Sequence, residues 1–245
     1  MRSYAIGDIH GQIDLLERAH QLIAKDRDFC GDHEAPVVHL GDLVDRGPDS
    51  AGVIRYLRDG IAAGHPWEVL QGNHDRLFHR FMADPDWRDT ALRPDVDWLH
   101  AALGGAETLM SYGIPDARAR PLRRVHDMAR EQVPREDVAF LAARPLTLMR
   151  GEVLFVHAGI RPGVPLEAQT EQDLVWIREP FLSDTRDHGL LIIHGHTAIP
   201  EPTHYRNRVN IDSRAAYGGP LTVIVVEKRQ VWALTETGRE PLTPL

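Results

Sequence analysis

The sequence contains one cysteine, Cys30, among its 245 residues. A single cysteine excludes an internal disulfide. A reactive thiol needs a positively charged setting, whereas the sequence neighbours of Cys30 include Asp26, Asp28 and Asp32. We therefore expect neither a disulfide scaffold nor a catalytic thiol, and we interpret Cys30 as incidental.

Long hydrophobic runs are also missing. No apolar stretch approaches the roughly 20 residues that a membrane-spanning helix needs. The N-terminus continues directly into the apolar run at residues 4–6, without a basic, apolar and small-residue leader. We therefore expect a cytoplasmic protein that has no membrane partner.

Positive charge is scarce, because 28 Lys and Arg face 36 Asp and Glu and give a formal net charge of -8. Nucleic-acid binding depends on Lys and Arg that neutralise phosphates, so we expect no nucleic-acid partner. An anionic substrate must then be attracted by local groups. The composition, 42% apolar and 26% charged, is typical of a folded globular protein.

Hydrophobic periodicity predicts helices in the first half of the chain and strands mainly in the second half. Helical spacing covers residues 12–25 and 50–63, with Ser50 as a candidate N-cap. Short β-branched runs predict strands at 4–6, 36–40, 67–70, 147–149, 153–156, 190–193, 209–211, 221–226 and 230–234. We predict a single domain over residues 1–245 of the α/β (α+β) class, in which helices cover mixed sheets.

Residues 84–135 differ from the rest, because they are rich in Pro, Asp and Arg and have weaker periodicity. We expect this stretch to be an insertion or cap beside a functional site. Helices are expected at 98–110 and 134–142. The end of the chain, residues 241–245, is expected to be a frayed tail.

Five short polar strings carry the chemistry of this sequence. The first three follow apolar runs and are therefore expected on loops that leave strands, where α/β folds collect catalytic groups. A lone Gly-Asp or Gly-Asn-His is usually a turn, but five such strings in one chain indicate a site. They are G-D-I-H-G at 7–11, G-D-L-V-D-R-G at 41–47, G-N-H-D at 72–75, H-A-G at 157–159 and H-G-H-T at 194–197.

The strings supply oxygen and nitrogen ligands for two metal ions. Asp8 and His10 are two residues apart, so on an extended backbone they point the same way and can bind one ion. Asp42 can bridge two ions. Oxygen and imidazole ligands without thiolates suit divalent ions, with Mn²⁺ favoured over Fe or Zn. The expected ligands are Asp8, His10, Asp42, Asn73, His157 and His196.

Two such ions about 3.5–4 Å apart would clamp an in-line displacement at phosphorus and activate a bridging water as the nucleophile. His74, next to Asn73, would act as general acid on the departing oxygen, and Asp45 would orient its ring. The forked guanidinium of Arg46 fits phosphate oxygens and supplies local positive charge.

The order of these strings resembles the metallophosphoesterase superfamily. The Asp45-Arg46 pair resembles its PPP branch, which holds Ser/Thr protein phosphatases, small bacterial and phage phosphatases, and symmetrical diadenosine tetraphosphatases. The resemblance extends from Asp8 to about Gly219 and implies a β-sandwich of mixed sheets flanked by helices. It implies Asp8, His10 and Asp42 on one metal, and Asp42, Asn73, His157 and His196 on the other.

The resemblance also implies a second phosphate-binding arginine in the Trp-containing string at 173–179, which is Arg178 here. Arg178 has an alternative role as a surface ion pair with Glu179 or Asp173. Many relatives outside this branch have a histidine where this chain has Ala198, which leaves the first metal with fewer protein ligands and implies that water completes its shell.

Two further histidines and two further segments are assigned no role in the chemistry. We expect His39 to be a hydrogen-bonded core residue and His194 to be a neighbour of the ligand His196. Residues 210–213 and 217–219 resemble site-lining segments of small bacterial relatives, and we assign them no catalytic role.

From these features we predict a phosphomonoesterase that acts on phosphoserine or phosphothreonine in proteins. The alternative is symmetrical hydrolysis of diadenosine tetraphosphate, although residues 84–135 contain no nucleotide signature. A catalytically silent module that binds phosphorylated partners is a third hypothesis, against which the intact strings argue. The expected partner is a phosphorylated protein or a small phosphoester, and the oligomeric state stays undetermined.

Overall fold

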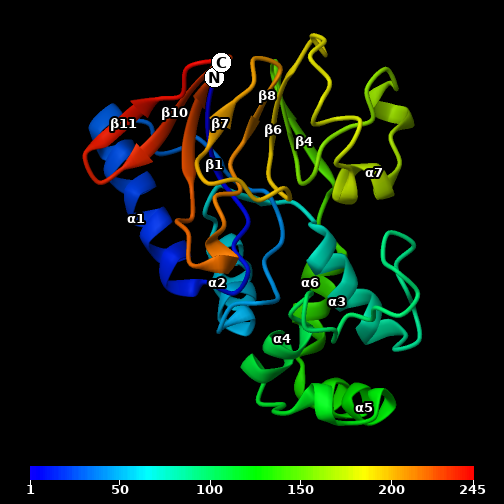
Figure 1. Cartoon of the computed structure of the whole chain (residues 1–245). Coiled ribbons are helices and arrows are strands. Elements are labelled where there is room, and N and C mark those ends of the chain that lie inside the picture. Colours follow the sequence, from blue (N-terminus) through cyan, green and yellow to red (C-terminus); the bar gives the residue numbers. More distant parts are fainter.

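Two β-sheets lie face to face in the computed structural model, which describes residues 1–245 (Figure 1). In spatial order the first sheet contains β11 (Gly238–Pro241), β10 (Gln230–Thr235), β9 (Val223–Glu227), β1 (Arg2–Ile6), β2 (Val37–His39) and β3 (Trp67–Val69). The second contains β4 (Thr147–Arg150), β5 (Val153–Val156), β6 (Leu191–His194), β8 (Arg208–Asn210) and β7 (Thr203–His204). Each sheet combines parallel and antiparallel pairs, which confirms the predicted mixed sheets.

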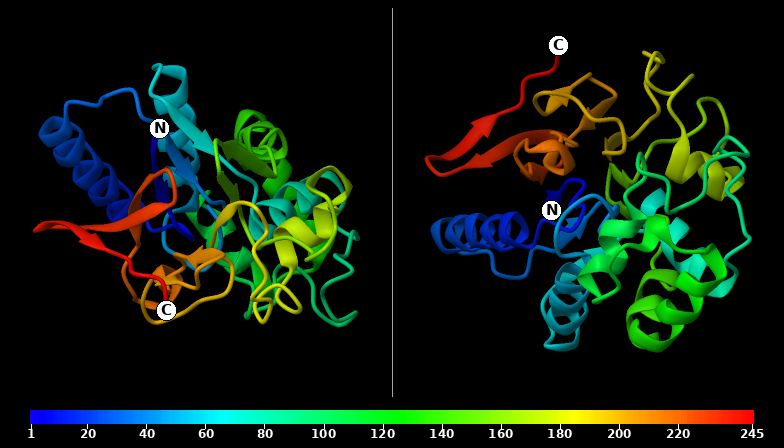
Figure 2. Two further views of the ribbon diagram at one scale, coloured as in Figure 1. Left: turned by 90° about the horizontal axis from the view of Figure 1, so that it is seen from above. Right: turned by 60° about the horizontal axis from the view of Figure 1, so that its bottom comes forward.

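Seven α-helices flank the sheets, as predicted. They are α1 (Ile13–Cys30), α2 (Ser50–Ala62), α3 (Asn73–Ala83), α4 (Gly105–Ser111), α5 (Leu122–Gln132), α6 (Arg135–Ala142) and α7 (Glu171–Trp176). Helix α1 stands apart from α4, α5 and α6 in Figure 1 and in both views of Figure 2. None of these helices is long and apolar enough to cross a bilayer.

The alternation of side chains along β1 explains the layers. Successive residues of a strand point to opposite faces. Tyr4 and Ile6 pack into the cluster formed with the helices, whereas Ala5 packs into the cluster between the two sheets. Both faces of β1 are therefore buried, which is why this segment is almost continuously apolar.

Residues 84–135 pack into the same core as the first sheet. Leu103, Leu109 and Val125 belong to one buried cluster with Ile6 and Leu57. Within the helix expected at 98–110 only α4, which begins at Gly105, is helical, and α5 was not expected. The short helix is preceded by turns, because Gly104 adopts a left-handed conformation (φ 92°) at its N-cap.

Two local expectations are wrong. The N-cap of α2 is Asp49, whose carboxylate accepts the Gly52 N–H (2.7 Å), while the Ser50 hydroxyl accepts the Asp45 N–H (3.1 Å). The tail is not frayed, because its backbone is tied to two other segments. Leu242 N–H donates to the Val231 carbonyl (2.9 Å) and Leu245 N–H to the His204 carbonyl (3.0 Å).

Cys30, at the end of α1, lies next to an arginine that is distant in sequence. The Arg2 guanidinium donates to its sulfur (2.7 Å) and also pairs with Asp32 and Glu227. The acidic flanking sequence therefore does not describe the whole surroundings of this thiol, which lies outside the site described below.

Candidate active site

The parallel strands of both sheets direct their following loops to one cavity. Strands β1, β2 and β3 are parallel in the first sheet, and β5, β6 and β8 are parallel in the second. Each polar string of the sequence begins at the last residue of one of these strands or within three residues after it. The cavity has a volume of about 230 Å³. Its lining includes His10, Asp42, Arg46, Asn73, His74, Trp176, Arg178, His196, Asp212 and Tyr217.

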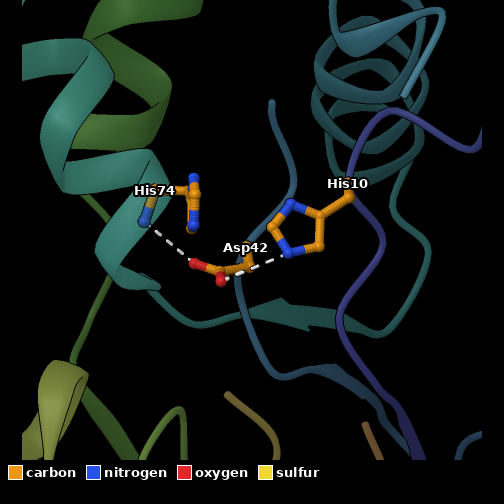
Figure 3. A group of neighbouring side chains, drawn as sticks. All are labelled: His10, Asp42 and His74. Atoms are coloured by element: carbon orange, nitrogen blue, oxygen red, sulfur yellow. Dashed lines mark hydrogen bonds and ion pairs between the residues drawn. The ribbon is translucent and has the colours of Figure 1, made fainter. Parts of the chain in front are cut away.

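Asp42 lies between the two groups of predicted ligands. Its Oδ2 is 3.5 Å from His10 Nε2, and its Oδ1 is 3.4 Å from His157 Nε2. Oδ1 also accepts the backbone N–H of His74 (2.9 Å), at the start of α3 (Figure 3). The two carboxylate oxygens thus face different histidines, which is the arrangement that a carboxylate bridging two ions requires.

The second group of ligands converges on one point. Asn73 Oδ1 lies 3.0 Å from His157 Nε2 and 2.8 Å from His196 Nδ1. His157 Nδ1 is 2.9 Å from the Leu40 carbonyl and donates its proton there. His157 Nε2 therefore carries a lone pair, which faces the Asn73 Oδ1 acceptor. A cation between these atoms satisfies both acceptors. Because the ligand atoms of Asp42, His157 and His196 all lie within 4.8 Å of one another, this group fits a metal ion.

The first group differs from the expectation in one respect. Ligand atoms of His10, Asp42 and His74 lie within 4.8 Å of one another, whereas Asp8 is directed to the backbone of His196, whose N–H it accepts (3.0 and 3.3 Å). The structure therefore brings His10 and Asp42 together and places Asp8 beside them. Burial and the carboxylates of Asp212 and Asp42 raise the pKa of Asp8 well above its usual value.

The predicted histidine ligands are neutral. Burial lowers the pKa of His10, His157 and His196 below the ordinary value of an exposed imidazole. Metal ions bind the neutral ring, so this burial prepares all three as ligands.

His74 and Asp45 form a buried pair next to the ligands. His74 Nδ1 donates to Asp45 Oδ2 (2.7 Å), which leaves Nε2 of the same ring for the cavity. Asp45 also accepts the indole N–H of Trp98 (2.9 Å) and the hydroxyl of Thr108 (2.7 Å). These three contacts fix the carboxylate that holds the imidazole.

Sequence reasoning missed Trp98 and Thr108. Both belong to residues 84–135, where no motif or regular spacing marks individual side chains. It also gave no role to Asp75, although Asp75 stands in the G-N-H-D string. The Asp75 carboxylate accepts the N–H of Leu43 (2.8 Å) and of Gly72 (2.9 Å), and so joins the second and third loops.

Five predicted site residues have left-handed backbone conformations: His10 (φ 47°), Asp42 (50°), Asp45 (73°), Arg46 (67°) and His196 (64°). Residues other than glycine seldom adopt this conformation. Such strain persists where the surrounding structure fixes it, as it does at active sites. The loops are therefore shaped to direct these side chains.

Gly72 is required by the close approach of two of these loops. A Cβ at this position would lie 2.2 Å from Asp42 Oδ1 and 2.3 Å from the Asp42 backbone nitrogen. Any larger residue would displace the carboxylate that faces both groups of ligands.

The two predicted phosphate-binding arginines both line the cavity. Arg46 Nη1 is 2.7 Å from His10 Nε2. Arg178 forms no ion pair with Asp173, which pairs with Arg161 (3.1 Å), nor with Glu179, which accepts the Ser183 hydroxyl (2.5 Å). The surface ion pair expected as the alternative role of Arg178 is therefore absent.

The two other histidines lie where they were expected. His39 Nδ1 is 3.0 Å from the Glu68 carbonyl, and the ring is fully buried. His194 Nδ1 is 3.1 Å from the Gly195 carbonyl, and its ring packs edge-on against Phe181. Neither ring belongs to the two groups of ligand atoms.

Comparisons with known proteins agree with this arrangement. The family model described as calcineurin-like phosphoesterase matches residues 1–226. The chain is 23% identical to the asymmetrical bis(5'-nucleosyl)-tetraphosphatase PrpE of Bacillus velezensis, over 89% of this chain and 86% of the relative. It is 33% identical to the symmetrical bis(5'-nucleosyl)-tetraphosphatase of Delftia acidovorans, over 66% of this chain and 46% of the relative.

Solved structures show the same fold. A structure described as a putative diadenosine tetraphosphatase superposes with a TM-score of 0.66 at 19% identity and covers 98% of this chain and 93% of that one. A cold-active protein-tyrosine phosphatase of Shewanella superposes with a TM-score of 0.58 at 17% identity, over 99% and 80% of the two chains. The family match and the shared fold confirm the resemblance seen in the sequence, and the chain belongs to the calcineurin-like phosphoesterases.

Proposed function

We propose that the protein hydrolyses dinucleoside tetraphosphates. Two relatives that match along much of the chain are named as bis(5'-nucleosyl)-tetraphosphatases. Their names support the alternative hypothesis from the sequence more than the phosphoprotein substrate that we first favoured. The substrate would then be a small phosphoester with a nucleoside at each end.

One structural observation carries this choice. Arg46 lines the site cavity and also an adjoining cavity of about 510 Å³. Pockets that bind small molecules typically have volumes of about 300–1,000 Å³. The second cavity therefore offers space for a nucleoside next to the phosphate-binding arginine, which a phosphorylated side chain alone would not fill.

Residues 84–135 form most of the wall of that second cavity, through Ala106, Glu107, Met110 and residues 116–119. The sequence analysis expected this stretch to be an insertion or cap beside the site. We propose that residues 84–135 act in this way, as a part of the single domain that contacts the substrate beyond the phosphates.

The chain's own groups account for the proton transfer. Water adds to a phosphorus atom and releases a proton to the solvent, the bond from phosphorus to the bridging oxygen breaks, and His74 Nε2 gives its proton to the departing oxygen. His74 is then protonated again from the solvent. Asp45 holds the ring in place and stabilises its charged form. Arg46 and Arg178 bind the phosphate oxygens.

Two divalent ions would complete the site. Asp8, His10, Asp42, Asn73, His157 and His196 would hold them, and we propose Mn²⁺ as the ion. When bound, such ions activate water and neutralise the charge of the transferred group.

The second cavity can be tested by filling it. Met110→Trp places a large ring in its wall, and Met149→Trp on β4 is a control of similar exposure (54% and 50% for the two methionines). We expect Met110→Trp to lower kcat/KM for diadenosine tetraphosphate by about tenfold or more and to leave hydrolysis of p-nitrophenyl phosphate unchanged. Equal activity of both variants on the dinucleotide would contradict the proposed use of this cavity.

Product analysis distinguishes two modes of cleavage. Two molecules of ADP indicate cleavage of the central phosphate bridge, and ATP plus AMP indicate cleavage of an outer bridge. Either pair of products supports the proposed substrate class, and the absence of both contradicts it.

A further inference from the structure

Tyr217 is an exposed aromatic side chain in the wall of the active site. It lines the site cavity and is 62% exposed. The other large hydrophobic side chains with comparable exposure do not line this cavity. Nothing in the reaction described above uses this ring, although it lines the cavity in which that reaction is proposed to occur.

The ring lies against the phosphate-binding arginine. The Arg46 guanidinium carbon is 5.3 Å from the centre of the Tyr217 ring, within the range of a cation–π contact. The same guanidinium reaches His10 at its Nη1. A ligand with its phosphate on Arg46 would therefore have the group next to that phosphate near the tyrosine.

The backbone around Tyr217 is held in one conformation. It ends the short 3₁₀ helix Ala215–Tyr217, between left-handed residues Arg214 (φ 67°) and Gly218 (φ 83°). Tyr217 N–H donates to the Arg214 carbonyl (2.8 Å), and the Asp212 carboxylate accepts the Arg214 N–H (3.1 Å). The ring is thus presented on a fixed loop, so a ligand loses little free energy in ordering it.

We infer that Tyr217 is the stacking platform for a nucleobase of the substrate. This inference rests on the proposed function and assigns a contact to one of the two nucleosides, the one outside the second cavity, whose wall does not include Tyr217. Aromatic rings stack on all bases because every base has a π-face. The platform therefore selects nucleotides over bare phosphates but discriminates little between adenine and guanine.

The inference is tested by binding, which does not depend on turnover. ADP and pyrophosphate share a diphosphate, but only ADP has a base. Titration calorimetry on the manganese-loaded protein compares both ligands in the wild type, Tyr217→Ala and Tyr217→Phe, with Phe29→Ala as a control at a 90% exposed aromatic residue that does not line the site cavity. Circular dichroism verifies that each variant is folded.

We expect Tyr217→Ala to weaken ADP binding by about 5- to 140-fold, the range given by base–aromatic stacking. Pyrophosphate binding should change by less than about twofold, and Tyr217→Phe and Phe29→Ala should bind both ligands like the wild type. Equal weakening of ADP and pyrophosphate would show that the ring only positions Arg46, and would overturn the inference. Unchanged ADP binding in Tyr217→Ala would also overturn it.

This experiment separates the inference from the proposed function. If the wild type cleaves diadenosine tetraphosphate and Tyr217→Ala binds ADP normally, the function stands and the platform is wrong. If the wild type does not cleave the dinucleotide, the proposed function fails whatever the calorimetry shows.

Discussion

His74 is the residue whose role depends most on geometry. Its Nδ1 is held by Asp45, and one of its ring nitrogens lies within 4.8 Å of the ligand atoms of His10 and Asp42. The same position therefore suits a general acid or a metal ligand. The hydrogen bond to Asp45 favours the acid, because a carboxylate stabilises the charged ring that donates the proton.

Replacement of His74 distinguishes these roles. We expect His74→Asn to lower kcat by about 10²–10⁴-fold, the usual contribution of a general acid, and to leave the metal content unchanged. Metal analysis after dialysis provides the measurement, with Asp42→Asn as the variant that should lose metal from both sites. Loss of metal from His74→Asn would make His74 a ligand.

Among individual residues, the sequence indicated site residues that lie within the polar strings and missed contacting residues that lie outside them. The ligands follow strands in recognisable order, so their type and spacing could be interpreted without coordinates. Trp98 and Thr108 contact Asp45 only through the tertiary fold, and no local pattern predicts such contacts. The direction of Asp8 toward the backbone of His196 also depends on loops far apart in sequence.

At the scale of elements, the segment before α4 supports the His74–Asp45 pair from outside the strings. Trp98 lies between Phe78 of α3 and the Asp45 carboxylate, and it does not line the site cavity. Its indole N–H is thus a positioning contact that acts through Asp45 on His74.

Removal of this N–H should affect the chemical step alone. We expect Trp98→Phe to lower kcat by about tenfold, or about 1.4 kcal/mol, near the value of one hydrogen bond to a charged group. KM should not change. Trp87→Phe is the control, because the Trp87 indole N–H makes no hydrogen bond in the structure. A raised KM with normal kcat would contradict the positioning role.

The C-terminal strand illustrates why some elements escaped prediction. β11 is short and contains Gly238 and Pro241, so its sequence favours a turn or a tail. It is ordered by pairing with β10 and by Arg239, which donates to both oxygens of Asp26 in α1 (2.7 Å each). The contact between Arg239 and Asp26 joins residues 213 positions apart, beyond the range of periodicity arguments.

The Asp26 contact predicts a pH-dependent stability. Burial raises the pKa of Asp26, but Arg239 and the Tyr4 hydroxyl together lower it below its usual value. A carboxyl with a lowered pKa stabilises the fold above its unfolded pKa, near 3.8, and this contribution is lost as the pH falls through the folded value.

We therefore expect Asp26→Asn to lower the free energy of unfolding at pH 7 by about 1.5–3 kcal/mol. The difference from the wild type should shrink as the pH falls below about 4. Urea unfolding at several pH values measures this, with the exposed Asp28→Asn as control (side chain 78% exposed). A difference that stays constant from pH 7 to pH 3 would contradict the role of the ionised carboxylate.

At the scale of the whole molecule, two sheets bring six parallel strand ends to one cavity. The sequence predicted the fold class, because both the mixed pattern of elements and the order of the strings point to it. It could not predict the neighbouring cavity beside Arg46, which is formed by loops and helices from distant parts of the chain. The strings themselves serve enzymes with different substrates, so the substrate class depends on these surroundings.

The most direct test of the account is a comparison of two substrates in parallel. Manganese-loaded protein is given diadenosine tetraphosphate or a phosphothreonine peptide, with a chelator control for each, and kcat/KM is measured. The account predicts chelator-sensitive hydrolysis with a clear preference for the dinucleotide. A preference for the phosphopeptide would contradict the proposed substrate and restore the phosphoprotein phosphatase, and inactivity on both would favour a binding module.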